Sequence, residues 1–342
     1  MLRRITFGVL GVFLALALAN QASAQRVPCT GVISGQTPNQ LRAVLQAFCI
    51  QASAEAPLNL DEDVQYAGYN DTDEFLLAYN GVTGAGVVEQ PVHVVRLDKR
   101  QQAWTSADFP EIKTEILPGL TAACLGAIED IQKAGALFYV SIHLSPSAEC
   151  LAVISRDLKL QRVFSGWIAA EFSSGAVVLE ASTVHFAPTH PLSLSLFDPS
   201  DGSMKSIYPV ENDPLRARYV QRLRTEISPA DRCQGENCEA DPEHFDSDLT
   251  PVCLSVECKP AIAVNDEAAS LAFGVQFSPI GFIRSDKVNR TEWNEQVVFV
   301  YRFIGGEVEH REFTVSEMQS QFGVASIDAL LMPDMLKRVF GH

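Results

Sequence analysis

Two stretches of the chain share one pattern, Ser141-Ile142-His143-Leu144-Ser145-Pro146-Ser147 and Thr183-Val184-His185-Phe186-Ala187-Pro188-Thr189. A weaker third copy is Gly274-Val275-Gln276-Phe277-Ser278-Pro279-Ile280. Each copy follows an apolar run and leads, directly or after a longer loop, into another run that is typical of a β-strand. This repetition predicts one sheet-forming unit that occurs several times along the chain.

Short β-prone segments, separated by Asn, Asp, Gly and Pro, surround these copies. Three groups of four lie within residues 61–211, and a last group lies within residues 261–315. We predict an all-β fold of four-stranded antiparallel units, with three of the four strands predicted in the last unit. The predicted strands are Val64–Tyr69, Glu74–Asn80, Val92–Asp98, Gln101–Ala107, Gly126–Ile131, Leu137–Leu144, Cys150–Arg156, Leu160–Trp167, Trp167–Phe172, Ala176–Phe186, Leu192–Asp198, Met204–Tyr208, Ala269–Phe277, Gln296–Phe303 and Val308–Val315.

Short helices are predicted at both ends of the β units and in one insertion. Thr37-Pro38, followed by apolar residues at helical spacing, predicts a helix over residues 38–51 within an N-terminal cap, residues 25–60. Asp213-Pro214 starts a second predicted helix, in a Cys-rich insertion over residues 212–260. Residues 316–342 form a helical tail that Pro333 kinks or splits. We expect the terminal helices to cover the β body and protect its edges.

The first 24 residues are typical of an export signal, with two arginines, an apolar stretch and the small-residue end Ala22-Ser23-Ala24. We therefore expect an exported protein, periplasmic or secreted. No later run reaches the roughly 18 apolar residues of a membrane span. The net charge is −16, and −18 without the first 24 residues. Such acidity makes nucleic acid and anionic membrane surfaces poor partners.

All eight cysteines follow the predicted signal, and an even number in an oxidising compartment favours disulfides. Their order suggests pairing between neighbours in the chain. The last four also have a loosely zinc-like C-x4-C spacing, but export favours disulfides. The predicted pairs are Cys29 with Cys49, Cys124 with Cys150, Cys233 with Cys238, and Cys253 with Cys258.

Two segments resemble β-propeller repeats. Leu194-Ser195-Leu196-Phe197-Asp198-Pro199-Ser200-Asp201-Gly202 looks like an outer blade hairpin with a D-P-x-x-G turn, and residues 143–147 look like the S-P-D-G turn of secreted and WD-like propellers. The 42 residues from His143 to His185 are a usual blade length. Over residues 62–210 and 262–315, the resemblance implies a propeller of four to five four-stranded blades, the fifth only if the insertion hides one. Ligands of such folds bind at the mouth of the central channel.

The repeated pattern also supplies candidate site residues. His143, His185 and Gln276 occupy equivalent positions where the second strand of a unit meets the third, and His190 lies in the same loop as His185. These four side chains are candidate ligand-binding groups, and the three histidines are candidate ligands of a divalent metal ion. In the alternative, the position repeats for folding, because His or Gln can bond to a turn carbonyl. Asn80 is the approximate counterpart in the first unit.

No short catalytic pattern occurs, since G-x-S-x-G, P-loop, H-E-x-x-H and G-x-G-x-x-G sequences are all missing. We predict a non-catalytic binding or assembly module for an unknown protein or a small polar ligand. The alternative is a metal-assisted hydrolase or lactonase-like enzyme with its site at one mouth of the propeller. The arginines of the helix at residues 213–227 suggest a third hypothesis, in which this helix docks an acidic partner or pairs with the acidic loop at residues 231–248. In the structural alternative, these arginines lie on a solvated face and form ordinary i,i+4 pairs.

Overall fold

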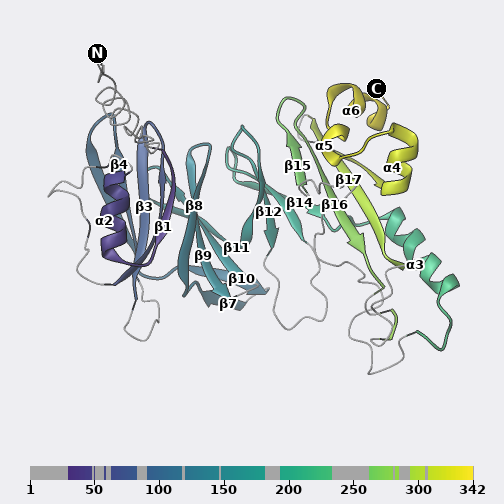
Figure 1. Ribbon diagram of the computed structural model, residues 1–342, viewed down its shortest axis with the longest axis horizontal. Coiled ribbons are helices and arrows are strands. Elements are labelled where there is room, and N and C mark those ends of the chain that lie inside the picture. Colours follow the sequence, from purple (N-terminus) through teal and green to yellow (C-terminus); the bar gives the residue numbers. More distant parts are fainter. Residues whose placement is uncertain are drawn as a thin grey trace, which may run out of the picture.

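Antiparallel sheets, stacked along the long axis of the molecule, make up most of the computed structural model (Figure 1). Helices lie at its two ends. The structure describes residues 30–47, 50, 58, 63–82, 91–117, 120–145, 148–181, 193–232, 262–279, 282–284, 293–304 and 307–341. The predicted signal peptide lies outside these residues, as do His185 and His190.

Sheet 1 contains five strands in chain order: β1 (Gly31–Gly35), β2 (Val64–Asn70), β3 (Glu74–Gly81), β4 (Val92–Asp98) and β5 (Ala103–Phe109). The four strands predicted for the first unit are confirmed as β2 to β5. The fifth, β1, was not predicted and comes from the segment assigned to the N-terminal cap. It pairs with β2 along its whole length.

A seven-stranded sheet follows, in the order β14-β13-β12-β11-β10-β9-β8. Its long strand β11 (Leu160–Glu171) was predicted as two strands. The first half of β11 pairs with β10 and the second half with β12, and the change occurs at Gly166. Gly166 has φ of 140°, and a Cβ there would overlap the carbonyl oxygen of Glu180. The other strands are β8 (Ala127–Ala134), β9 (Leu137–Ser145), β10 (Ala148–Ser155), β12 (Val177–Ala181), β13 (Leu194–Asp198) and β14 (Ser203–Tyr208).

The shared strand β11 divides this sheet into two four-stranded units. We call β8–β10 with the first half of β11 sheet 2, and the second half of β11 with β12–β14 sheet 3. Sheet 4 consists of β15 (Ile262–Asn265), β16 (Ser270–Phe277), β17 (Glu295–Ile304) and β18 (Glu307–Thr314). A small hairpin of β6 (Lys113–Leu117) and β7 (Leu120–Ala123) was not predicted.

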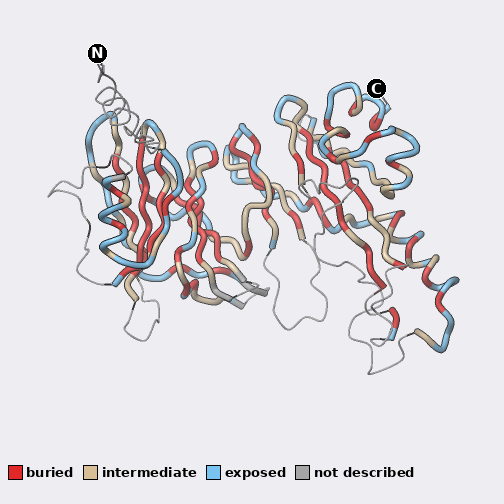
Figure 2. The backbone as a smooth tube through the Cα atoms, in the orientation of Figure 1, coloured by how far each residue is buried: buried red, intermediate tan, exposed pale blue. Residues whose placement is uncertain are grey.

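Each sheet packs face to face on the next, so the core is a series of apolar layers (Figure 2). Val94 of sheet 1 and Val140 of sheet 2 belong to the first layer, and Val153 and Val177 join sheets 2 and 3. Sheets 3 and 4 share the largest layer with the helix α3 (Pro214–Glu226). The prediction of α3 is confirmed, with the Asp213 side chain accepting the N–H of Arg216 at its N-terminus.

Helices cover the two outer faces of the stack. The helix α2 (Pro38–Ala47) packs on sheet 1 through Leu41 and Leu45. The outer face of sheet 4 is covered by α4 (Val315–Phe322), α5 (Ile327–Leu330) and α6 (Pro333–Phe340), and the expected break at Pro333 is confirmed. These helices therefore cover the β body, as expected, by packing on the outer faces of sheets 1 and 4. No sheet in the described residues closes on itself.

The hairpins that join the first and second strands of the four units lie in one row. Lys133 of the β8–β9 hairpin pairs with Glu74 of sheet 1, and Gly135 packs closely against Gly175 of the β11–β12 turn. The backbone N–H of Ser173, in the β11–β12 turn, donates to Oδ1 of Asp266, which precedes β16. The second strands β3, β9, β12 and β16 all start at this row. Their far ends, where Asn80, His143 and Gln276 lie, therefore belong to the opposite side of the stack.

The predicted Cys124–Cys150 disulfide is confirmed, with the two Cα atoms 6.0 Å apart. It ties the segment after β7 to β10, inside the layer between sheets 1 and 2. Cys29, Cys49, Cys233, Cys238, Cys253 and Cys258 lie outside the described residues. None of the described helices has the length and apolarity needed to cross a membrane.

Candidate functional site

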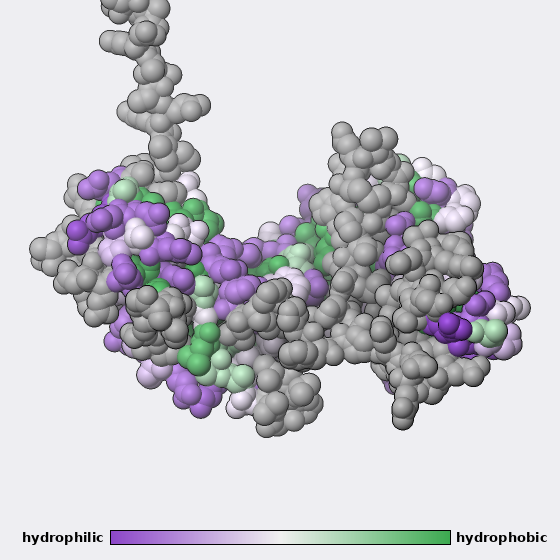
Figure 3. Space-filling view, turned by 60° about the horizontal axis from the view of Figure 1, so that its bottom comes forward, coloured by the Kyte–Doolittle hydropathy of each residue, from purple (hydrophilic) through white to green (hydrophobic). Residues whose placement is uncertain are grey.

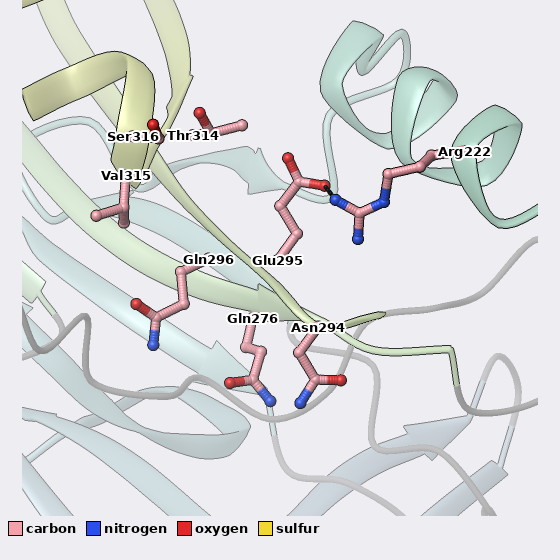
Figure 4. A pocket seen from close by; sticks show the side chains of 8 residues that line it. All are labelled: Arg222, Gln276, Asn294, Glu295, Gln296, Thr314, Val315 and Ser316. Carbon is pink, nitrogen blue, oxygen red and sulfur yellow. Dashed lines mark hydrogen bonds and ion pairs between the residues drawn. The ribbon is translucent and has the colours of Figure 1, made fainter. Parts of the chain in front are cut away.

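Gln276 lines a polar pocket at the end of sheet 4, with a volume of about 490 Å³. Strands β16 and β17, the N-terminus of α4 and the helix α3 all contribute to it (Figure 4). Gln276 and Gln296 lie directly opposite each other on β16 and β17, so their side chains leave the same face of the sheet. The described lining residues are Arg222, Gln276, Asn294, Glu295, Gln296, Thr314, Val315 and Ser316.

The alternation of β16 explains why Gln276 reaches this pocket. Phe273, Val275 and Phe277 point into the layer shared with sheet 3, while Ala272 packs against the terminal helices. Gln276 therefore belongs to the helix-covered face, close to the end of the strand. The pocket opens there because the apolar contacts with the helices have ended.

The N-terminus of α4 is held by a capping box. The Thr314 hydroxyl accepts the N–H of Glu317 at 3.1 Å, and the Glu317 carboxylate accepts the N–H of Thr314 at 2.9 Å. This pair fixes Thr314, Val315 and Ser316 along the pocket wall. The sequence Thr-x-x-Glu is a signature of this cap, and we did not predict the cap from it.

The charges that line the pocket neutralise each other. Arg222 donates to Glu295 at 2.7 Å and to the carbonyl oxygen of Trp293 at 2.9 Å. In Figure 4, Gln276, Gln296 and Asn294 point away from this ion pair, which lies on the α3 side of the pocket. The lining therefore offers hydrogen-bond donors and acceptors without net charge.

No known protein family matches this chain, and no curated protein does.

His143 lies on β9 of sheet 2 and is not among the described residues that line the Gln276 pocket. Its Nδ1 atom is 3.4 Å from Oε1 of Glu129, and it lies directly opposite Glu149 on β10. Burial, and then the carboxylates of Glu129 and Asp130, raise the pKa of Glu149 to about 7. The structure thus surrounds His143 with acids, and sheet 3 lies between it and Gln276.

The predicted metal site remains a prediction, because His185 and His190 lie outside the described residues. Within the described part of the chain, no three or more His, Cys, Asp or Glu side chains are grouped to bind a metal ion. Asn80, the counterpart in the first unit, is buried and donates to the carbonyl oxygen of Gly126 at 3.1 Å. At this one position the repeated polar residue ties sheet 1 to sheet 2.

Two arginines of α3 pair within the chain. Arg218 makes a bidentate contact with Glu317 of α4, at 3.0 and 3.3 Å, and Arg222 pairs with Glu295. These contacts fix α3 against sheet 4 and its covering helix. Most of the acidic 231–248 loop lies outside the described residues.

Proposed function

We propose that the chain is a non-catalytic binding module that holds an uncharged polar ligand in the pocket around Gln276. The observation that carries this proposal is the composition of the described lining, which consists of amides, hydroxyls, one valine and an Arg222–Glu295 pair whose charges neutralise each other. A charged ligand would compete with that pair. A hydroxyl-rich ligand of the saccharide class can accept and donate many hydrogen bonds without breaking it.

We also propose that the four units are propeller-like blades, arranged as an open stack. The β13–β14 hairpin supports the likeness, because Asp198 Oδ1 accepts the N–H of Ser200 and Gly202 takes φ of 70° in the turn. The helix-covered outer faces of sheets 1 and 4 favour an open stack over a closed ring. The disulfide and the signal-like N-terminus support export to the periplasm or the medium.

The test is binding of neutral oligosaccharides to the whole exported chain. Oligomers of glucose and of N-acetylglucosamine are titrated at pH 6 and followed by calorimetry. Gln276→Leu and Gln296→Leu keep the side-chain size but remove the hydrogen bonds, so each should weaken binding at least tenfold. Gln319→Leu, on the exposed side of α4, is the matched control and should bind like the native chain.

Two results would contradict the proposal. Equal affinity of Gln276→Leu, Gln296→Leu and the native chain would show that the ligand binds elsewhere. Lack of binding by every neutral oligosaccharide at millimolar concentration would reject the ligand class.

A metal-assisted hydrolase is the second candidate, and the surroundings of His143 favour it. His143 Nδ1 lies 3.4 Å from Oε1 of Glu129, so an imidazole and a carboxylate, two types of ligand for a divalent ion, lie side by side. Metal analysis of the purified chain tests this function. A stoichiometric divalent ion that is lost in His143→Ala supports it, and the lack of any bound ion rejects it.

A further inference from the structure

Two carboxyl groups meet where α3 begins. Asp213 is the N-cap of α3, and its Oδ1 atom accepts the N–H of Arg216 at 2.8 Å. Glu312, on the edge strand β18, accepts the N–H of Leu215 through Oε1 at 3.2 Å. The two side chains therefore bind neighbouring N–H groups of one helix terminus, and they also contact each other. Residues of both elements line a cavity of about 580 Å³.

The remaining oxygen of each carboxyl group lacks a donor. Asp213 Oδ2 and Glu312 Oε2 are buried, and no N–H or O–H of the described residues donates to either. Two ionised carboxylates in contact would have only acceptors to offer each other. A proton on Glu312 supplies the missing donor and allows the two groups to share a hydrogen bond.

The surroundings favour that proton. Burial, then the nearby Asp213 carboxylate, raises the pKa of Glu312 to about 8. Burial and Arg311 lower the pKa of His310, so this histidine is neutral above pH 7. The charged and titratable groups around the pair are Arg216 and Arg218 of α3, Tyr301 of β17, His310 and Arg311 of β18, and Glu317 of α4. Among these neighbours, the pKa of Tyr301 is raised by burial and that of Glu317 is lowered by Arg218, so neither titrates between pH 7 and 9.

We propose that a proton shared by Asp213 and Glu312 holds the N-terminal end of α3 against β18, and that its loss loosens α3. The helix also carries Arg222, which bonds to Glu295 and to the carbonyl oxygen of Trp293 in the polar pocket. Loosening of α3 therefore alters the wall of that pocket. This second consequence rests on the proposed function, whereas the proton-dependent contact does not.

Hydrogen exchange of α3 between pH 6 and pH 9 tests the contact directly. The peptide covering residues 213–227 is followed by mass spectrometry, with rates corrected for base catalysis. In the native chain, protection should fall about tenfold for each pH unit from 6 to 8 and then level off, because the closed form alone binds the proton in this range. In Glu312→Gln the carboxamide donates permanently to Asp213, so protection should stay constant.

Glu149→Gln is the matched control, since it also removes a carboxyl of raised pKa but lies on sheet 2. It should leave the pH response of α3 as in the native chain. Constant protection in the native chain, or an equal loss in Glu312→Gln, would overturn the proposal.

Oligosaccharide binding separates the two consequences. If the native chain and Glu312→Gln bind equally at pH 6 but only the variant keeps its affinity at pH 9, both parts are supported. Exchange that follows the expected pattern without any binding at pH 6 would reject the pocket function and leave the contact intact.

Discussion

Glu74 and Glu312 are both glutamates at contacts between layers, yet their surroundings have opposite charge. Glu74, between sheets 1 and 2, is fully buried and surrounded by cations: Arg96 Nε lies 2.6 Å away, Lys133 Nζ 2.7 Å and Arg156 Nε 3.0 Å. Glu312, between sheet 4 and α3, meets another carboxyl group. Burial alone would raise both pKa values, but the bonds from Lys133, Arg96 and Arg156 lower that of Glu74.

Because of this difference, the contact at Glu74 is permanent over the neutral pH range, whereas the contact at Glu312 depends on pH. Glu74 stays ionised throughout the neutral range, so the contact between sheets 1 and 2 does not depend on pH there. Glu312 exchanges its proton close to pH 8, so the contact of α3 does. On the face shown in Figure 3, the coloured surface is mostly hydrophilic, with apolar residues in separate small areas. Ion pairs and carboxyl contacts, in addition to the apolar layers, therefore fix the ends of the sheets.

Removing the Glu74 charge should have the largest effect. Glu74→Gln removes the fully buried carboxylate shared by Lys133 and Arg96, whose side chains are 19% and 11% exposed, and leaves them only the outer carboxylates of Asp71 and Asp98. Loss of one partner from a buried ion pair costs about 3–5 kcal/mol. Urea unfolding at pH 7 measures this loss, with Glu307→Gln on the exposed start of β18 as the control. A loss below about 1 kcal/mol would show that the cations find other partners.

Acid should weaken the same contact. The pKa of Glu74 is lowered in the folded chain, so its stabilising effect is complete above the ordinary glutamate pKa of about 4.5 and disappears as the pH falls through the lowered value. For Glu312 the sign is reversed, because its pKa is raised to about 8. Its contribution is complete below about pH 4.5 and is lost as the pH rises through 8.

Asp213→Asn should therefore have a moderate effect that depends on pH. Asparagine caps a helix about as well as aspartate, so the bond to the N–H of Arg216 is kept. The amide also donates to Glu312 and removes one of the two charges, so the variant should be more stable than the native chain at pH 9, by about 1 kcal/mol. Urea unfolding at pH 6 and pH 9 measures the difference. An equal loss at both pH values would mean that only the cap had been damaged.

Local sequence signals predicted most strands and the start of α3, because each element has its own alternation, turn residues or cap. Val92–Asp98 was predicted residue for residue, and Asp213-Pro214 marked the helix. The short strand β1, with glycine at each end, gave no such signal, since its pairing with β2 spans more than 30 residues. The continuous strand β11 was divided in the prediction because its partner changes at Gly166, a property of the tertiary structure.

One of the candidate residues, Gln276, lines a pocket in the structure, and its role in binding stays a prediction. Gln276 was found through the repeated pattern, but the pocket that it lines also needs Arg222 from α3 and Gln296 from β17. The arginines of α3 were considered for docking an acidic partner, but nothing local in the sequence links Arg222 or Gln296 to Gln276, because their approach depends on strand register and on the packing of α3. Glu312 was missed for the same reason, since only the fold places it beside Asp213.

The smallest effect is expected for an ion pair in the same row of hairpins as Glu74. Arg100 bonds to Asp73 at 2.8 Å, but the two side chains are 76% and 41% exposed. Water and salt screen such a pair, so Arg100→Gln should cost at most about 0.5 kcal/mol, and the cost should vanish in 1 M salt. Urea unfolding at low and high salt measures it beside Glu74→Gln, whose loss should persist in salt. Equal losses of stability in both variants would show that burial does not explain the difference between the Glu74 contact and the exposed Arg100–Asp73 pair.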